Sequence, residues 1–168
     1  MKNALLKLTF FLFCIGIFSS MSTKFSTAFE KVKSLYVPVS LGELIDKLTI
    51  LEIKSERIKN EGKLKNIQRE VRELKSVLGQ IKLYSIKNEK VLTTYYKELK
   101  VINETLWDIE NNIRKKESEK QFDQEFIELA RSVYITNDKR GSLKQKINIL
   151  FHSKLREEKE YVSYQKAR

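Results

Sequence analysis

Apolar residues recur at alternating intervals of three and four along two stretches of the chain, and this spacing constrains the fold most. The first stretch carries Leu64, Ile67, Val71, Leu74, Leu78 and Ile81; the second carries Leu92, Tyr95, Leu99, Ile102, Leu106, Ile109 and Ile113. The spacing places each set on one side of an α-helix, as in coiled coils. We expect helices over 64–81 and 87–119, joined by a turn at Tyr84-Ser85, with the two seams facing each other in a long antiparallel hairpin.

More helices are expected on both sides of this hairpin. Ser40 and Glu43 form an S-x-x-E capping box, which opens a first helix, and Gly62 is its expected stop. A fourth helix is expected from Phe122-Asp123, a hinge over 137–142, a fifth helix over 143–151, and a tail from Ser153 that is helical only in part. The chain has 5 Gly and 1 Pro, too few breakers for an all-β fold. The predicted fold class is all-α: an antiparallel helical bundle with a long coiled-coil-like hairpin.

The positive charge gathers at the two ends of the chain. Of the net charge of +11, residues 1–36 contribute +4, residues 139–168 contribute +6, and the stretch between them only +1. We divide the chain into an apolar and basic N-terminal extension, residues 1–35, and a helical domain, residues 36–168, with a basic C-terminal tail. Basic tails attract nucleic acid or anionic surfaces weakly and without specificity. The chain has no strong nucleic-acid-binding motif.

The N-terminal segment, residues 1–22, has three interpretations. Lys2 and Lys7 precede an apolar run from Leu8 to Phe18, 11 residues long. This run is too short to span a bilayer and has the length of a signal-peptide core. Because Met21 is also a plausible start, the segment is cleaved, retained as a weak anchor, or upstream of the true start. We favour a cytoplasmic location, with secretion or anchoring as alternatives. Cys14 is the only cysteine, so neither an intrachain disulfide nor a cysteine-based zinc site can form.

Several blocks of the sequence are similar to a known family. Residues 36–54, YVPVSLGELIDKLTILEIK, resemble the opening of an uncharacterised family of small bacterial proteins, a domain of unknown function. The blocks 103–110, 126–134, 137–140 and 157–161 match the same family, so that the resemblance covers nearly all of 36–164, whereas residues 1–35 depart from its pattern. The resemblance implies a helical fold and a bacterial or phage-like ancestry, and it implies no activity.

A set of polar residues at helical spacing forms the candidate ligand site. Its members lie on the third and fourth helices: Trp107, Asp108, Glu110, Glu128, Arg131, Asn137, Asp138 and Arg140. Carboxylates and guanidinium groups that converge from facing helices can bind a phosphorylated or carboxylated ligand. The same residues can also form interhelical salt bridges and helix caps, which is the interpretation we favour.

A second set of carboxylates could hold a divalent cation. Glu43, Asp46 and Glu52 on the first helix could join Asp108 and Glu110, as in helical enzymes that bind Mg²⁺. The single histidine, His152, excludes the Glu-x-x-His pairs of di-iron bundles. We expect no metal and no cofactor, and the sequence identifies no catalytic residue.

Three functions agree with the sequence. The first is a helical interaction or scaffold module that binds a protein partner or a second copy through its helices. The second is a helical enzyme that binds a small molecule or nucleotide in the acidic and arginine-containing pocket. The third is weak nucleic-acid or anionic-surface binding through the basic termini, with membrane contact only if the N-terminal segment is retained. We favour the first, without an enzymatic activity.

Overall fold

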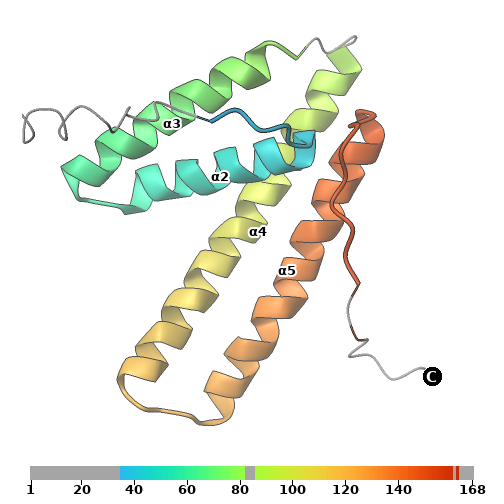
Figure 1. The fold of residues 1–168 in the computed structure, drawn as a ribbon. Coiled ribbons are helices and arrows are strands. Elements are labelled where there is room, and N and C mark those ends of the chain that lie inside the picture. Colours follow the sequence, from blue (N-terminus) through green and yellow to red (C-terminus); the bar gives the residue numbers. More distant parts are fainter. Residues whose placement is uncertain (1–34, 82–85, 161, 163–168) are drawn as a thin grey trace, which may run out of the picture. The chain divides into compact units, whose positions relative to one another are not determined.

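The computed structural model describes residues 35–81, 86–160 and 162 as four helices without a strand (Figure 1). The helices are α2 (Leu41–Arg57), α3 (Glu61–Gly79), α4 (Ile86–Ser118) and α5 (Gln124–Leu150). The all-α fold class is confirmed. The chain divides into two units, Met1–Val37 and Pro38–Arg168, and the fold described below is that of the second. The signal-like segment and the turn at Tyr84-Ser85 lie outside the described residues.

Helix α2 is the hub of the second unit. It contacts α3, α4 and α5, and α4 and α5 form the long antiparallel hairpin (Figure 1). The described backbone of α3 comes close to α2 but to neither helix of the hairpin. The expectation that the seams of 64–81 and 92–113 face each other is therefore wrong. Heptad spacing identifies the apolar side of each helix, but it does not identify which helix covers that side.

The core lies where α2 crosses the upper part of the hairpin. Leu44, Ile45 and Leu48 of α2 pack with Leu99 of α4 and Ile147 of α5 in one buried cluster. Half-buried Leu74 and Leu78 of α3 pack against this cluster. Apolar residues from all four described helices thus meet in one core around α2.

The first predicted helix begins where α2 begins, and the third predicted helix matches α4 closely. Ser40 caps α2, because its Oγ accepts a hydrogen bond from the backbone N–H of Glu43 at 3.2 Å. The expected stop at Gly62 is wrong, since α2 ends at Arg57 and Gly62 already lies in α3. An extended Ile58 ends α2, and the side chain of Asn60 caps the next helix. A capping side chain in the connection, rather than the glycine, therefore separates the two helices.

Helix α5 runs without interruption through the stretch 137–142, for which the sequence predicts a hinge followed by a separate fifth helix. The turn-forming residues of this stretch gain partners from other elements. Arg140 binds Asp46 of α2, and the side chain of Lys159 lies over the backbone of Gly141. These tertiary contacts outweigh the local turn preference. The tail from Ser153, predicted to be helical in part, has no helix in its described residues.

The end of α5 also caps the start of α2. The backbone N–H of Gly42 donates to Asn148 Oδ1 at 2.7 Å, and that of Leu41 donates to Ser153 Oγ at 3.3 Å. With the Ser40 cap, these bonds satisfy the first N–H groups of α2, which have no partner within their own helix. His152, at φ 53°, reverses the chain after α5 and brings Ser153 into this position. Hydrogen bonds therefore hold the start of α2 against the end of α5.

We predict that Gly42→Ala weakens the fold. A Cβ at Gly42 would lie 2.6 Å from the Lys144 carbonyl oxygen and 2.9 Å from Asn148 Oδ1, so α2 and α5 would have to move apart. The free energy of unfolding, measured by urea denaturation, should fall by about 2–3 kcal/mol. Gly79→Ala is the matched control, because nothing lies within 4 Å of the position that its new methyl group would take, and it should raise stability by roughly 0.5 kcal/mol. Equal effects of the two substitutions would contradict the close approach at Gly42.

Candidate functional site

Buried polar residues gather where α2 crosses α4 and α5. Asp46 of α2 is 2% exposed, and its carboxylate accepts hydrogen bonds from Arg140 Nε at 2.8 Å and Nη2 at 2.5 Å. Asn103 of α4 donates to Asp46 Oδ1 and to Thr49 Oγ1, both at 2.9 Å. We call Asp46, Thr49, Asn103 and Arg140 the crossing cluster. The hydrogen bond to Asp46 raises the pKa of Arg140, so the guanidinium stays charged at any physiological pH.

The crossing cluster is suited to fixing three helices rather than to chemistry. A general base needs a free lone pair that faces the substrate. The Asp46 carboxylate instead accepts three hydrogen bonds from protein side chains and is buried. Asp46, Thr49 and Asn103 are buried and Arg140 is half-buried, and a hydrogen-bonded cluster of this kind specifies one packing arrangement.

Lys144 links α5 to two other elements. Its ammonium group, on a residue 7% exposed, binds Glu43 of α2 and lies 2.8 Å from Glu157 Oε2 of the C-terminal segment. Desolvation lowers the pKa of Lys144, but its hydrogen bonds to Glu157 and Glu43 outweigh this effect and raise the pKa overall. The same contact lowers the pKa of Glu157. Lys144 therefore holds the C-terminal segment against α5.

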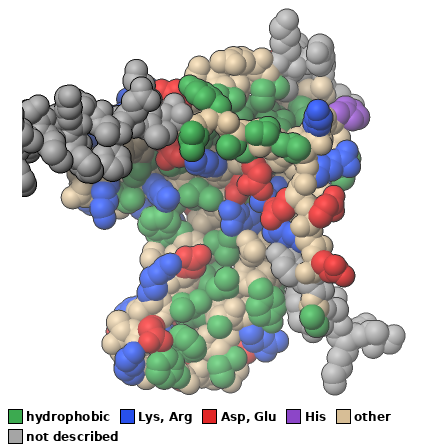
Figure 2. All heavy atoms as spheres, in the orientation of Figure 1, with side chains coloured by type: hydrophobic (Ala, Val, Ile, Leu, Met, Phe, Trp, Pro, Cys, Tyr) green, Lys and Arg blue, Asp and Glu red, His purple; other side chains and the backbone are tan. Residues whose placement is uncertain are grey.

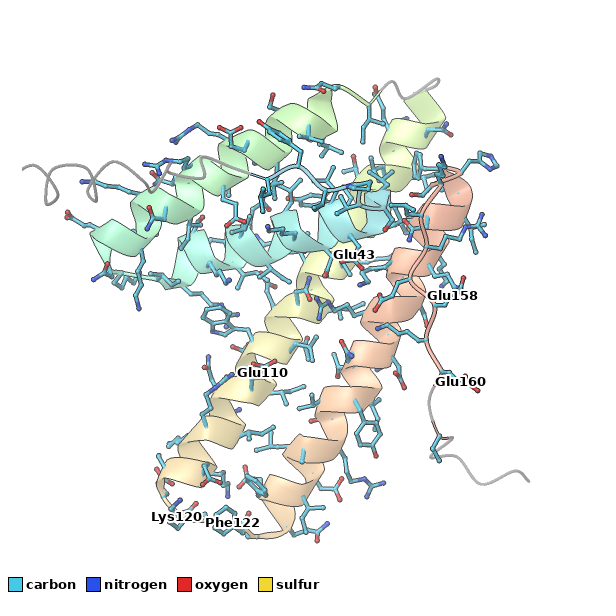
Figure 3. All side chains as sticks on the ribbon, in the orientation of Figure 1. Glu43, Glu110, Lys120, Phe122, Glu158 and Glu160 are labelled. Atoms are coloured by element: carbon cyan, nitrogen blue, oxygen red, sulfur yellow. The ribbon has the colours of Figure 1, made fainter. Side chains whose placement is uncertain are left out.

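A pocket of about 240 Å³ lies between α5 and the C-terminal segment. Its walls are polar and carry both charges: Asp138, Gly141, Ser142, Lys144, Gln145, Asn148, Glu157, Glu158 and Lys159. Figure 3 shows Glu158 and Glu160 on the segment that runs beside α5. Lys144, its most buried cation, is already neutralised by two carboxylates. The pocket therefore offers no concentrated charge for an anionic ligand.

The predicted site residues do not converge on one pocket. Asp108 pairs with Arg57 of α2, and the Arg57 guanidinium lies 5.8 Å from the centre of the Trp107 ring. Hydrogen bonding to Asp108 raises the pKa of Arg57. Glu110 pairs with Arg114 one turn along α4, far from Glu43 (Figure 3).

The remaining predicted residues lie on α5 in three separate surroundings. Glu128 and Arg131 form an exposed pair at 3.3 Å. Asn137 accepts a hydrogen bond from Arg140 at 3.4 Å, beside the crossing cluster. Asp138 lines the pocket. The structure thus places Trp107 and Asp108 around Arg57 of α2, and it pairs Glu128 with Arg131 and Asn137 with Arg140 one turn apart along α5.

The carboxylates considered for a metal site are each engaged by a cation. Glu43 binds Lys144, Asp46 binds Arg140, Glu52 binds Lys75, Asp108 binds Arg57 and Glu110 binds Arg114. Within the described part of the chain, no three acidic, histidine or cysteine side chains are grouped to hold a metal ion. The magnesium hypothesis therefore has no geometric support.

Four polar residues that hold the crossing together are absent from the site predicted from the sequence. Thr49, Asn103, Lys144 and Asn148 are all buried. The sequence does indicate burial for two of them. Lys144 and Asn148 each come directly after a residue of the buried pair Leu143 and Ile147, so they lie beside that pair on the helix. A polar residue on the buried side of an amphipathic helix needs a partner there, and this rule could have identified them.

The lower part of the hairpin presents a different kind of surface. We call residues 107–135 the distal hairpin; it begins at Trp107 and Asp108, which contact Arg57 at the end of α2. Every hydrophobic residue in it is at least partly exposed, and Figure 2 shows hydrophobic side chains on this part of the surface. The largest exposed ones are Phe122, Ile127 and Tyr134. Lys120 and Phe122 lie at its tip (Figure 3).

We predict that the two arginines of α5 differ sharply in their effect on stability. Arg140→Gln leaves the buried Asp46 carboxylate without its cation and should cost about 3–5 kcal/mol in urea denaturation. Arg131→Gln removes an exposed one-turn pair and should cost less than about 0.5 kcal/mol. If Arg140→Gln were as mild as Arg131→Gln, the crossing cluster would not stabilise the fold.

We also predict that acid releases the C-terminal segment. Because the Lys144 contact lowers the folded-state pKa of Glu157, the contact stabilises the segment above the unfolded pKa and is lost as pH falls through the folded value. Heteronuclear NOE values for residues 155–160 should therefore drop between about pH 6 and pH 3. Glu157→Gln should show low NOE values already at pH 6, and Glu158→Gln should behave like the unmodified chain. A pH-independent segment would contradict the role of Glu157.

Comparison with known proteins agrees with the resemblance seen in the sequence. No described helix has the length and apolar character needed to cross a membrane. No curated protein and no solved structure matches the chain. The model of a family of unknown function, DUF6165, matches residues 35–166, which include all four described helices. The chain therefore belongs to DUF6165, a family of unknown function.

Proposed function

We propose that the protein is a helical interaction module and that its distal hairpin is the docking surface. One observation carries this proposal: no hydrophobic residue between Trp107 and Ile135 is buried. Helices of soluble domains normally bury their apolar side against another layer. Among the described residues, α4 and α5 cover each other in the distal hairpin and α2 reaches it only at Arg57, so that a partner would supply a further layer.

The contrast with the upper part of the same helices supports the proposal. There, Leu92 and Leu99 of α4 and Leu143 and Ile147 of α5 are buried in the core with α2. Both helices continue beyond the end of α2 with apolar residues such as Ile113, Phe126 and Val133, which stay half-buried. The apolar side of the two helices therefore extends further along the hairpin than α2 does. Exposed apolar surface of this kind commonly marks a protein-binding site.

Charge also favours a protein partner at the distal hairpin. Both signs alternate over it, with basic residues at 114–116 and acidic residues at 123, 125 and 128. A polyanion such as nucleic acid would be attracted to one extended basic face, and this surface has none. Polar residues of mixed sign around an apolar centre are usual at protein interfaces.

The alternative functions have weaker support. The pocket beside α5, at about 240 Å³, is smaller than most ligand sites, which measure roughly 300–1,000 Å³. Of the eight predicted ligand-binding residues, only Asp138 lines it. Binding of anionic surfaces through the basic termini has no built site in the described residues.

Site-specific photo-crosslinking in the cells that naturally produce the protein tests the proposal. Benzoylphenylalanine in place of Ile127, which is 48% exposed, should yield a defined adduct. The same group in place of Val77 on α3, which is 45% exposed, should yield none. Since the two positions are equally accessible, the comparison reports docking rather than exposure. Adducts of equal yield at both positions, or at neither, would contradict the proposed function.

A further inference from the structure

A row of cations lies on the outer side of α3. Lys65, Arg69 and Arg72 follow each other at intervals of four and three, so they share one side of the helix. All three are exposed, whereas buried Ile67 and half-buried Leu74 lie on the opposite side. The row is roughly 10 Å long. We call Lys65, Arg69 and Arg72 the basic row.

The basic row is not neutralised by the rest of the protein. Within the described residues, none of its three side chains forms an ion pair or a hydrogen bond. The charged residues of α3 that face α2 behave differently. Glu70 binds Lys47 of α2 at 2.6 Å, and Lys75 lies 3.1 Å from Glu52 of α2. The packing of α3 on α2 therefore pairs charges between the two helices and leaves the cations of the basic row in solvent.

Two carboxylates border the basic row without cancelling its charge. Glu61 and Glu73 each lie one turn along α3 from a member of the row. Lys59 and Lys63 are exposed and stand near the start of the same helix, and their two charges offset the two carboxylates. The three positive charges of the basic row therefore remain in excess on this surface.

The chemistry of the basic row fits a series of backbone phosphates. Guanidinium and ammonium groups are the usual partners of phosphate oxygens in nucleic-acid complexes. Helix α3 contains no aromatic residue on which the bases of a single strand could stack. Its outer side also lacks an apolar residue that could insert into a bilayer; besides the basic row it carries Glu61, Gly62, Glu73 and Ser76. A duplex needs neither feature, because its bases are already stacked and its phosphates lie outside.

We propose that the outer side of α3 binds the phosphate backbone of a nucleic-acid duplex through Lys65, Arg69 and Arg72, independently of the base sequence. This surface is separate from the distal hairpin, which α4 and α5 form (Figure 1). It is also separate from the basic termini, because α3 lies in the middle of the chain. Val77 lies about 80° round the helix from Arg69 and is therefore outside the basic row.

The salt dependence of duplex binding tests the basic row. Fluorescence anisotropy follows the binding of the full chain to a short labelled DNA duplex between about 25 and 150 mM NaCl. Each phosphate contact adds about 0.9 to the steepness with which log K falls against log[salt]. Lys65→Gln, Arg69→Gln and Arg72→Gln should therefore each reduce this steepness by about 0.9, and the triple variant by about 2.7. An RNA duplex of the same sequence shows which form of the backbone binds more tightly, and its binding must weaken in the same variants.

The variants should remain folded, because all three positions are exposed and glutamine is a good helix former. Circular dichroism melting checks this. Three substitutions in the basic C-terminal region, Lys139→Gln, Lys146→Gln and Lys154→Gln, provide the matched control. Together they also remove three exposed cations, and they should leave the salt dependence nearly unchanged.

Four results would overturn the proposal. Equal losses of salt dependence in the two triple variants would show diffuse attraction to the whole chain. Absence of duplex binding, or tighter binding of the single strand, would show that the basic row does not recognise a duplex backbone. Tighter binding to vesicles with about one-third phosphatidylserine than to either duplex would identify an anionic membrane surface as the partner instead.

Discussion

The close contact between the start of α2 and the end of α5 determines the rest of the structure. Gly42 has no side chain, so the backbone of α2 can lie against the Lys144 carbonyl, and its N–H reaches Asn148. From this point Asn148, Lys144 and Arg140 follow at intervals of four along α5 and meet Gly42, Glu43 and Asp46 in turn. Three contacts along one helix face fix both the distance and the angle of the crossing.

Because the crossing is fixed at one end of the hairpin, no described helix other than α4 and α5 extends over the other end. Helix α2 contains 17 residues and α4 contains 33, so α4 and α5 run past the end of α2 by several turns. Helix α2 cannot shift along α5 to cover more of the hairpin. A shift by one turn would leave the Asp46 carboxylate buried without Arg140. The exposed apolar side of the distal hairpin is thus a consequence of how the crossing is held.

Much of the fold follows from the sequence, and the reasons for the failures are specific. The Ser40 cap and the heptad spacing place α2 and α4 correctly, because both signals are local. The hinge predicted over 137–142 is wrong, because the partners of Arg140 and Gly141 come from Asp46 and Lys159, far away in the sequence. The candidate site shows the same limit. Arg140 and Asp108 are recognisable as unusual polar residues, but only the fold shows that Asp46 and Arg57 neutralise them.

The molecule places charged groups inside its crossing and hydrophobic groups on its distal hairpin. Under the proposed docking function, this arrangement separates the residues that stabilise the fold from those that bind a partner. Buried ion pairs contribute more to a unique packing arrangement than to net stability, so the crossing cluster sets the geometry in which the distal hairpin is presented. Apolar residues such as Ile127 contribute little to the folded monomer, because they are exposed in it, and they gain stabilisation only when a partner buries them. A substitution at Arg140 should therefore act on folding and, under the proposed docking function, one at Ile127 on association. If the hairpin is rigid and docks only at its far end, the effect of the first substitution on stability and the effect of the second on binding should be independent.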